Sequence, residues 1–298
     1  MKALILTDLR KGHENQSVAF CEIMGFKYEL CNVSYSNKFF KLLSYVLDFF
    51  GILIKIFNIQ NKDFQNFDLF VGAGSQTYYA LKFLSKKYNK KNIALMYPKG
   101  YKKDFSFIIA TSHDNPKKAE NIKILPVNLN FLKPQNFYKP SKKAIGFIIG
   151  GNNKNFIMND EILEKIDEIR DFFKDYEFLI TTSPRTPKKI ESALMQKKFD
   201  FSVIYSKNPI NPISDFLSGC EFVFITIDSV SMISEAVCNF SANIAILPLS
   251  RRNEKENKFD RFIKNLQKGG YLQIYSSPKN LQKTAKINLK NLMKDIKL

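Results

Sequence analysis

Several residue types are scarce in this chain of 298 residues: it has no tryptophan, two histidines and four cysteines. Because the cysteines are scattered without a CxxC pair, neither a zinc site nor a disulfide framework is indicated, and a reducing compartment is expected. The low counts of glycine (12) and proline (11) exclude collagen-like and disordered chains. Acidic residues are also few: 28 Asp and Glu face 46 Lys and Arg, a formal net charge of +18. That charge favours nucleotides, nucleic acid or anionic lipid as partners without choosing among them.

Short apolar runs alternate with helical stretches along the whole chain. The runs lie at 3–7, 68–72, 93–96, 106–110, 144–149, 177–181, 201–205, 222–226 and 243–247. Strands that alternate with helices predict parallel sheets with crossover helices. Residues 132–143 hold two prolines and four lysines without apolar periodicity, which is typical of a linker. We therefore expect two doubly wound α/β domains, residues 1–140 and 141–298.

Residues 39–57 are nearly all apolar. Their few polar members fall in one narrow stripe at helical spacing and are Lys41, Ser44, Tyr45, Asp48 and Lys55. The segment is interpreted either as a buried core helix or as a helix that enters an anionic membrane surface, which the surrounding lysines favour. Asp48 and the length disfavour a membrane span. Because the opening run is too short for a secretory signal, we expect a cytoplasmic protein, peripheral on the inner face of the membrane.

The C-terminal segment, residues 278–298, is basic and amphipathic. Apolar or small side chains recur at helical spacing, with lysines outside them, at Leu281, Ala285, Leu289 (or Asn288), Leu292 and Ile296. This pattern predicts a helix that either packs across the two domains or contacts a membrane.

Polar motifs follow the strands of the first domain. Asp8 ends the first strand, and the stretch 9–17 contains Gly12 and His13 before a helix expected near Val18. A turn at the carboxyl end of a strand is where open α/β sheets bind ligands, and histidine titrates near neutral pH. A solvated polar turn is the alternative interpretation.

Two further strands of this domain end in candidate motifs. Gly72-Ala73-Gly74-Ser75 follows the second predicted strand, where its glycines permit either the approach of a ligand or tight packing of a helix on the strand. His113 and Asp114 follow another strand on the same edge, where a helix N-cap is the alternative.

In the second domain, three strands end in motifs suited to phosphate. Residues 150–152 (Gly-Gly-Asn) follow the first strand, where backbone amides commonly cradle a phosphate. The hydroxyls and arginine of 181–187 suit a diphosphate. The third strand leads into a helix capped by Asp228 or Ser229, where exposed amides suit a phosphate and Glu235 suits ribose hydroxyls.

A family resemblance is carried by four motifs that run in order across almost the whole chain. They are Asp8-x-x-x-Gly12-His13-x-Asn15-Gln16, Gly150-Gly151, Thr182-Ser183-x-Arg185-Thr186-Pro187 and Asp228-Ser229-Val230-Ser231-Met232-x-Ser234-Glu235-Ala236. Together they resemble the mitochondrial-fission Elm-like ("elongated mitochondria") family of glycosyltransferases. The first motif departs from the family pattern, which usually has Gly where Leu9 stands and Pro where Lys11 stands.

The resemblance implies a GT-B fold, in which two Rossmann-like domains face a cleft, the C-terminal one holding a nucleotide-sugar and the N-terminal one the acceptor. It also implies catalysis without a bound metal or cofactor, and the sequence has no DxD-type acidic metal motif near a strand end. In the donor pocket it places Gly150, Gly151, Thr182, Ser183, Arg185, Ser229, Ser231 and Met232, with Glu235 against the ribose; the strand-end motifs add Asn152 and Asp228. The candidate acceptor residues are Gly12, Asn15, Gln16, Gly74 and Ser75.

We therefore expect a glycosyltransferase of cell-envelope glycan biosynthesis that acts on a membrane-associated acceptor, lipid-linked or of lipopolysaccharide type. His13 is the expected general base, with Asp8 and Asp114 as substitutes. Two alternatives are an inactive GT-B scaffold that recruits partners at a membrane and a nucleotide-sugar epimerase on the same fold. Nucleic-acid binding is disfavoured because no RNP-like or helix-turn-helix pattern is present.

Overall fold

The computed structural model describes residues 1–253 and 256–296, and the chain divides into two units. Unit 1 comprises Met1–Phe131 and Asn288–Leu298, and unit 2 comprises Leu132–Ile287. The chain therefore changes unit after residue 131 and not after residue 140. The expected assignment of 141–298 to a single domain is corrected in the same way, because the chain returns to unit 1 at residue 288.

The proline- and lysine-rich stretch 132–143 is bound to unit 2 by two buried carboxylates. Asp215 accepts hydrogen bonds of 2.7–3.0 Å from the backbone N–H groups of 135–137. Glu177 accepts from the backbone N–H groups of 141–142. Such bonds satisfy backbone donors that have no strand or helix partner. The connecting stretch therefore belongs to unit 2, which the sequence could not show because both carboxylates lie more than 30 residues downstream.

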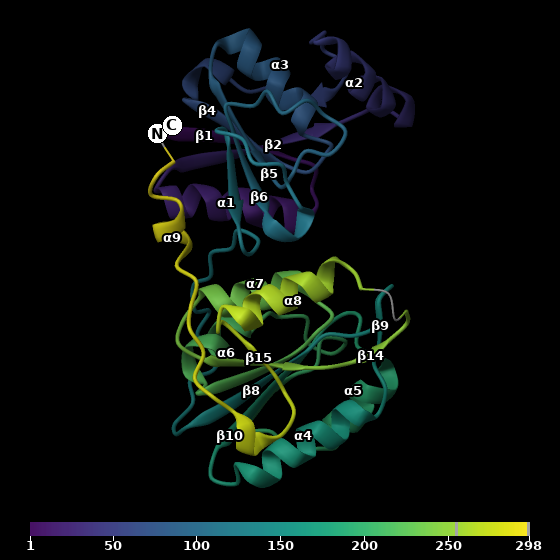
Figure 1. The fold of residues 1–298 in the computed structure, drawn as a ribbon, viewed down its shortest axis with the longest axis vertical. Helices are drawn as coiled ribbons and strands as arrows, with labels where there is room; N and C mark the ends of the chain where they lie inside the picture. The colour runs from purple at the N-terminus through teal and green to yellow at the C-terminus, as the bar shows by residue number, and fades with distance from the viewer. Residues whose placement is uncertain (254–255, 297–298) are drawn as a thin grey trace. The chain divides into compact units, whose positions relative to one another are not determined.

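Unit 1 contains a seven-stranded sheet in the order β3-β2-β1-β4-β5-β6-β7 (Figure 1). The strands are β1 (Lys2–Thr7), β2 (Lys27–Ser34), β3 (Asn58–Ile59), β4 (Leu69–Ala73), β5 (Lys91–Leu95), β6 (Phe107–Thr111) and β7 (Ile122–Leu125). Every neighbouring pair is parallel except β2–β3. The four strands predicted from apolar runs all form. The carboxyl ends of β1, β4, β5 and β6 therefore lie on one edge, which gathers the predicted motifs of this half.

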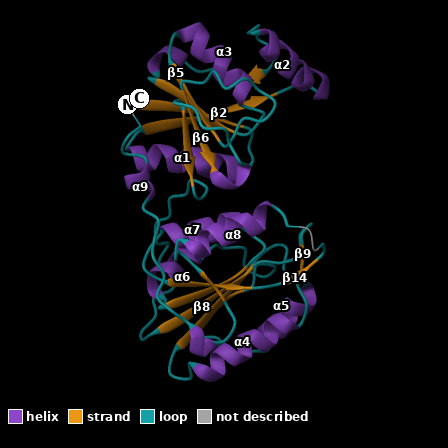
Figure 2. Cartoon of the chain, viewed as in Figure 1, coloured by secondary structure: helices purple, strands orange, loops and turns teal. Residues whose placement is uncertain are grey.

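Helices lie on both faces of this sheet (Figure 2). They are α1 (Lys11–Met24), α2 (Lys38–Phe50), α3 (Tyr78–Tyr88) and α9 (Leu289–Leu292), with short 3₁₀ turns η1 (Phe64–Asn66) and η2 (Ser112–Asp114). Leu4, Leu6 and Phe70 alternate toward the face that α3 covers, where they pack against Tyr79 and Leu81. Figure 1 shows α1 on the opposite face from α2 and α3.

Unit 2 contains an all-parallel six-stranded sheet in the order β11-β10-β8-β12-β13-β15. Its strands are β8 (Ala144–Ile149), β10 (Glu177–Thr182), β11 (Phe201–Val203), β12 (Phe222–Thr226), β13 (Asn243–Leu247) and β15 (Gln273–Ile274). A separate antiparallel pair joins β9 (Phe156–Ile157) and β14 (Ser250–Arg251). The helices are α4 (Glu161–Phe172), α5 (Lys188–Met195), α6 (Ile213–Gly219), α7 (Val230–Cys238) and α8 (Lys258–Lys268), with the 3₁₀ turn η3 (Pro278–Asn280). All five strands predicted in this half form, within two residues of their expected ends.

The first helix begins at Lys11 and not near Val18, so the predicted turn over 9–17 is wrong for most of its length. Gly12 lies in the first helical turn, where a helix tolerates glycine better than in its interior. Glu14 in the same turn is favoured by the positive end of the helix dipole. His13 therefore projects from the N-terminal turn of α1.

The predicted helix over 278–298 does not form in the described part of that segment. Only η3 and the single turn α9 are helical, and residues 297–298 lie outside the described residues. Lysines spaced four residues apart, such as Lys286 and Lys290, repel one another on a helix. Residues 278–294 contain no acidic side chain that could offset this repulsion. The backbone N–H groups of Ala285 and Ile287 instead bond to carbonyls of unit 2 at 2.9 Å.

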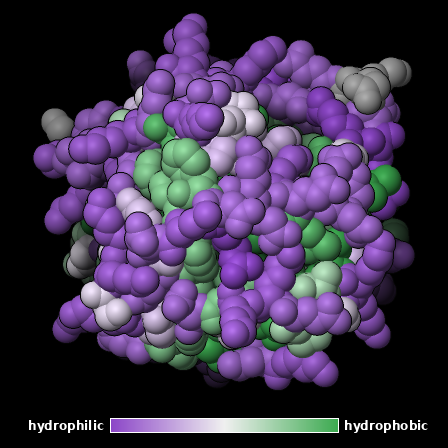
Figure 3. Space-filling view, turned by 90° about the horizontal axis from the view of Figure 1, so that it is seen from below, coloured by the Kyte–Doolittle hydropathy of each residue, from purple (hydrophilic) through white to green (hydrophobic). Residues whose placement is uncertain are grey.

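The interpretation of 39–57 as a buried core helix is wrong as well. Helix α2 does form, with Asn37 as N-cap and Gly51 at the C-terminus. Its fully buried residues are the polar Ser44 and Asp48, whereas Phe40, Leu43 and Leu47 are half-buried and its other large apolar side chains are exposed. On the face of the molecule drawn in Figure 3, apolar side chains lie in patches between hydrophilic ones.

Candidate functional site

Three loops meet at the carboxyl edge of the unit 2 sheet, and the buried Asp228 carboxylate joins them. It accepts hydrogen bonds from the Gly151 N–H (3.0 Å) and the Thr226 hydroxyl (2.6 Å). The Arg185 guanidinium forms an ion pair with it at 2.7 Å. Burial raises the pKa of Asp228, and these donors act against that shift. Asp228 therefore fixes the loops after β8, β10 and β12 relative to one another.

The Gly-Gly pair after β8 is required by this contact between loops. A Cβ at Gly150 would lie 2.1 Å from an Asp228 carboxylate oxygen, and one at Gly151 would lie 2.0 Å from the Arg185 carbonyl oxygen. Neither position has room for a side chain. The sequence predicted that this pair cradles a phosphate. In the structure, the absence of side chains at Gly150 and Gly151 allows the loop after β8 to contact the loops that hold Asp228 and Arg185.

Several of the predicted donor residues use their side chains inside these loops. The Thr182 hydroxyl donates to Glu191 at 2.8 Å and accepts from the Tyr205 N–H at 2.9 Å. The Asn152 side-chain oxygen accepts from the Met158 N–H at 2.8 Å. These groups therefore hold the loops in shape. The Arg185 side chain is 39% exposed, so the part of its guanidinium that does not contact Asp228 can bind an anion.

The N-terminus of α7 lies at the same edge. Ser229 is its N-cap and accepts a hydrogen bond from the Met232 N–H, so Ser229 and not Asp228 caps the helix. Ser231 is exposed in the first turn. The remaining amides of that turn and the positive end of the helix dipole form a ready place for a phosphate.

A pocket of about 260 Å³ opens beside these loops, bounded by β8, β10 and α7. It is lined by Ile148, Ile149, Thr181, Thr182, Ser183, Pro184, Tyr205, Pro209, Ile210, Asn211, Ile213, Met232 and Glu235. Four of the predicted donor residues, Thr182, Ser183, Met232 and Glu235, therefore share one cavity. The segment 205–213 was not anticipated, because it follows β11 as an irregular loop without a recognisable motif.

Glu235 supplies a carboxylate to this pocket. Burial raises its pKa to about 7, and no hydrogen-bond or ion-pair partner for its carboxylate lies among residues 1–253 and 256–296. A half-buried carboxylate without a partner is costly unless a ligand supplies donors. The site can therefore receive a molecule with hydroxyl groups at Glu235.

In unit 1, Asp8 and His13 form a hydrogen-bonded pair at the end of β1. The His13 Nδ1 lies 3.1 and 3.0 Å from the two carboxylate oxygens. A carboxylate accepts hydrogen bonds, so Nδ1 carries a proton, and in the neutral ring the lone pair is then on Nε2. The His13 side chain is 19% exposed. Gly74 backs the imidazole ring, since a Cβ there would lie 2.4 Å from His13 atoms.

The other first-unit candidates have partners of their own. Asp114 pairs with Lys99 (3.1 Å) and accepts from Thr111. The Gln16 amide donates back to the Gly12 carbonyl within α1. Ser75 offers its backbone carbonyl to Lys41 and Tyr101, and Asn15 is exposed on α1. The structure thus brings Asp8, His13 and Gly74 into direct contact.

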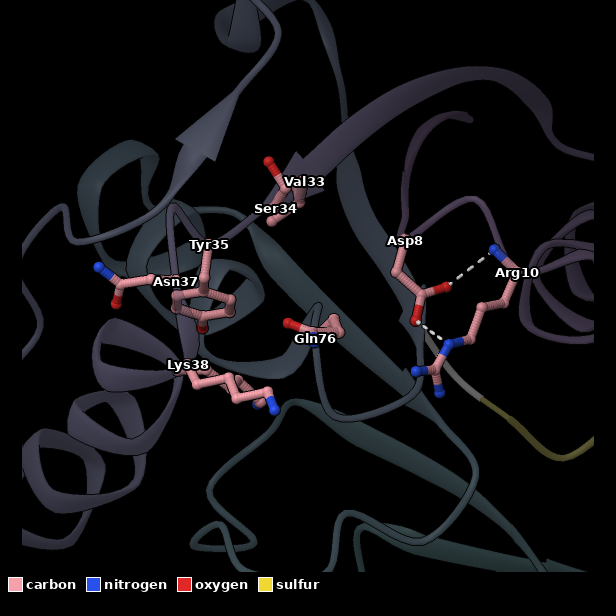
Figure 4. Close-up of a pocket in the computed structure, with 9 residues that line it drawn as sticks. Asp8, Arg10, Val33, Ser34, Tyr35, Asn37, Lys38 and Gln76 are labelled. Atoms are coloured by element: carbon pink, nitrogen blue, oxygen red, sulfur yellow. Dashed lines mark hydrogen bonds and ion pairs between the residues drawn. The ribbon is translucent and has the colours of Figure 1, made fainter.

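A cavity of about 400 Å³ adjoins Asp8 (Figure 4). It is lined by Asp8, Arg10, Val33, Ser34, Tyr35, Asn37, Lys38, Lys41 and Gln76. Figure 4 shows Asp8 bonded to Arg10 on one side of it, with Tyr35 and Lys38 across from them. The buried Gln76 Oε1 has no hydrogen-bond partner in the described part of the chain. Sequence reasoning missed most of this wall because β2, which leads into it, has polar residues between its apolar ones.

Among the described residues, no group of three or more His, Cys, Asp or Glu side chains is arranged to hold a metal ion. Within the same residues, no helix has both the length and the apolar character needed to cross a membrane.

The chain matches the model of the family described as mitochondrial fission ELM1 over residues 11–294. It belongs to that family. A relative in Rickettsia prowazekii (strain Madrid E), the uncharacterized protein RP120, is 28% identical over 285 residues, covering 79% of this chain and 80% of that protein.

Two solved structures resemble the ELM1-family chain in fold. One is the glycosyltransferase SnogD from Streptomyces nogalater, with a TM-score of 0.50 and 12% identity, covering 93% of this chain and 88% of that chain. The other is a protein from Listeria monocytogenes described as a UDP-N-acetylglucosamine 2-epimerase, also at 0.50 and 12%, covering 99% and 86%. At this identity the likeness concerns the fold alone, which is the parallel α/β fold of GT-B glycosyltransferases.

Proposed function

We propose that this ELM1-family protein is a metal-independent GT-B glycosyltransferase that moves a sugar from a nucleotide-sugar to a hydroxyl of a membrane-associated acceptor. The proposal rests on the unit 2 pocket, where the unpartnered Glu235 carboxylate lies next to loops joined by Asp228 and to the first turn of α7. In a nucleoside diphosphate, ribose hydroxyls donate to a carboxylate and phosphates accept from helix amides. The spacing of these two groups on one helix suits both parts of the same ligand.

The pocket walls support the assignment of a nucleotide base. Ile148, Pro209 and Ile210 supply apolar surface, while Asn211 supplies an amide. Ligand pockets usually combine such apolar walls with a few polar groups that fix orientation. In this proposal unit 2 binds the donor and unit 1 binds the acceptor, a lipid-linked or lipopolysaccharide-type glycan of the cell envelope.

The chemistry assigned to unit 1 is general-base catalysis by His13. Its Nε2 accepts the proton of the acceptor hydroxyl as that oxygen forms a bond to the anomeric carbon of the donor. The bond from that carbon to the diphosphate oxygen breaks, and the nucleoside diphosphate leaves with the electron pair. Arg185 and the first-turn amides of α7 offset the developing negative charge, so the proposal requires no metal or cofactor.

The test is a thermal-shift and calorimetric screen of the purified chain against UDP, GDP, CDP, CMP and dTDP. A ligand present at about 100 times its Kd stabilises the native state by about 2.7 kcal/mol, which is readily measured. We expect one nucleotide to bind, Arg185→Ala to weaken it, and the exposed α8 variant Arg261→Ala to bind as wild type. Binding of no nucleotide would remove the donor site and favour an inactive scaffold.

An epimerase would use the same donor pocket, and the solved relative described as a 2-epimerase makes it the second candidate. The two functions differ in their need for an acceptor. Conversion of the sugar of a bound nucleotide-sugar with no acceptor present would favour the epimerase, whereas release of nucleoside diphosphate only with a membrane extract would favour the transferase.

A further inference from the structure

Helix α2 is inverted relative to an ordinary surface helix, because its polar stripe faces the core. The buried Asp48 carboxylate lies 2.6 Å from the Lys82 ammonium of α3, with both side chains 3% exposed. Asp48 also accepts from the Lys102 N–H at 2.7 Å, and the Ser44 hydroxyl bonds to the Tyr101 hydroxyl at 2.9 Å. Breaking a buried ion pair is strongly unfavourable. These contacts therefore fix which face of α2 points outward.

Lys41 adds a second anchor on the same stripe. Its ammonium lies 5.3, 4.4 and 4.8 Å from the ring centroids of Tyr35, Tyr45 and Tyr101, and it donates to the Ser75 carbonyl. Burial lowers its pKa to about 8. The tyrosine faces attract the cation and compensate for lost water. Rotation of α2 about its axis would break this arrangement.

The outward face of α2 is consequently apolar over its whole length. Its exposed members are Phe39 (65%), Leu42 (64%), Val46 (47%), Phe49 (69%) and Phe50 (67%), and the following segment adds Ile52 and Ile54. Apolar residues at this spacing normally enter the core of a globular protein. A contiguous exposed patch of this kind marks an interaction surface.

The charges around the patch are basic. Lys38 and Lys55 are exposed at its two ends, and the Lys102 ammonium lies 6.0 Å from the Phe49 ring centroid. The one acidic residue of α2, Asp48, is buried, and the exposed Asp104 is paired with Lys82. Unit 1 as a whole has 22 basic and 11 acidic residues. The surface therefore complements an anionic partner, and two copies of it would repel each other.

We propose that this apolar face of α2, with Lys38, Lys55 and Lys102, docks on an anionic lipid bilayer. The phenylalanine side chains enter the boundary between headgroups and acyl chains, and the lysines contact the headgroups. Asn37, Lys38 and Lys41 of the same helix region also line the cavity beside Asp8. In the part of the proposal that rests on the proposed function, a lipid acceptor in that bilayer presents its polar head to this cavity.

The test is co-sedimentation of the full chain with vesicles of phosphatidylcholine alone or with 30% phosphatidylglycerol. We expect binding to the anionic vesicles and a fall of at least about tenfold in the partition coefficient for the double variant Phe39→Gln/Phe49→Gln. The matched control is Phe172→Gln, which changes an exposed phenylalanine (49%) of α4 in unit 2. The control should bind as wild type, and thermal melting should show that all three chains fold.

Equal vesicle binding by the double variant and the wild type would overturn the docking surface, as would no wild-type binding to either vesicle. A wild-type dimer in sedimentation velocity that the double variant abolishes would assign the face to a second copy instead. Nucleotide binding is measured on the same variants and should not change. If the wild type binds no nucleotide, the proposed function is refuted, whereas the result on membrane docking is unaffected.

Discussion

The Asp8 carboxylate lies 3.0 Å from the His13 Nδ1, and Gly74 packs against the Nδ1–Cε1 edge of the same ring. Residues from the ends of two neighbouring strands thus hold one imidazole in place. Asp8 fixes its tautomer, and the absence of a side chain at Gly74 leaves room for the ring. The proposed base is in this way positioned by groups that need not touch the substrate.

The Asp8–His13 pair predicts separate effects on turnover and on donor binding. His13→Ala should lower kcat by about 10²- to 10⁴-fold, because the acceptor hydroxyl would lose its base. Asp8→Asn should also lower kcat, since an amide can donate to Nδ1 and so stabilise the other tautomer. Nucleotide affinity measured by calorimetry should stay unchanged in both. Full turnover of His13→Ala would show that another group is the base.

The close approach at Gly74 predicts a loss of activity from the smallest possible substitution. In Gly74→Ala a methyl group would lie 2.4 Å from His13 atoms at a backbone φ of +84°, so the ring must move. We expect a large fall in kcat and a loss of stability of about 1–3 kcal/mol. Gly12→Ala is the matched control, because no atom lies within 4 Å of its new Cβ. That variant should fold as stably as wild type or better.

The ion pair between Arg185 and Asp228 predicts that the two residues are coupled. Asp228→Asn should destabilise unit 2 by about 2–4 kcal/mol, because it weakens the contact that joins three loops. Arg185→Gln should cost less stability, since that side chain is partly exposed, and should mainly weaken nucleotide binding. A double-mutant cycle measured by urea unfolding should give a coupling free energy of about 1–3 kcal/mol. Additive effects would refute the structural role of the pair.

Glu235 predicts a pH dependence with a definite sign. Its pKa is raised to about 7 from an ordinary value near 4.5, so the folded state holds this proton more tightly than the unfolded state. Its contribution to stability is therefore fully present below pH 4.5 and is lost as the pH rises to about 7. Glu235→Gln removes that loss. The variant should exceed wild type in unfolding free energy by about 1–3 kcal/mol at pH 8 and by less at pH 5.

The same variant separates stability from binding. If Glu235 accepts ribose hydroxyls, Glu235→Gln should weaken nucleotide binding even where it stabilises the fold. Urea unfolding at pH 5 and pH 8, with calorimetry at pH 8, checks both expectations. An unfolding difference that does not grow between these pH values would contradict the burial of a titrating carboxylate.

One departure from the family pattern lies at a backbone angle that favours glycine. Leu9 has a φ of +63°, in the left-handed region that glycine adopts without a Cβ penalty. Leu9→Gly should therefore leave stability within about 1 kcal/mol of wild type, because relief of strain offsets the greater freedom of glycine in the unfolded chain. Leu9→Ala, which keeps the Cβ, serves as the comparison in thermal melts.

Nine strands and the motifs at their ends could be predicted from the chain because apolar runs and strand-end glycines are local features, whereas β2, β7 and four two-residue strands were not predicted. The absence of a long helix in the described part of 278–298 could not be predicted. The apolar residues there have helical spacing, but backbone N–H groups of the segment bond to carbonyls of unit 2 that lie earlier in the sequence. Glu235 and Met232 were recognised as candidates through motifs. The loop 205–213 lines the same cavity as Glu235 and Met232, and Gln76 lines the cavity beside Asp8. Neither was predicted as a site residue, because neither belongs to a motif that indicates binding.

The sequence by itself determined two parallel α/β units, a basic surface and the edge of each sheet on which polar groups gather, because these follow from periodicity, composition and chain direction. Only the tertiary structure decided which polar groups face each other. Asp228 reaches Arg185 across 43 residues, and Asp48 reaches Lys82 across 34. The pairing of Asp48 with Lys82 turns the polar stripe of α2 inward and leaves phenylalanines exposed. The reason is that leaving a buried charge unpaired costs more free energy than exposing an apolar ring.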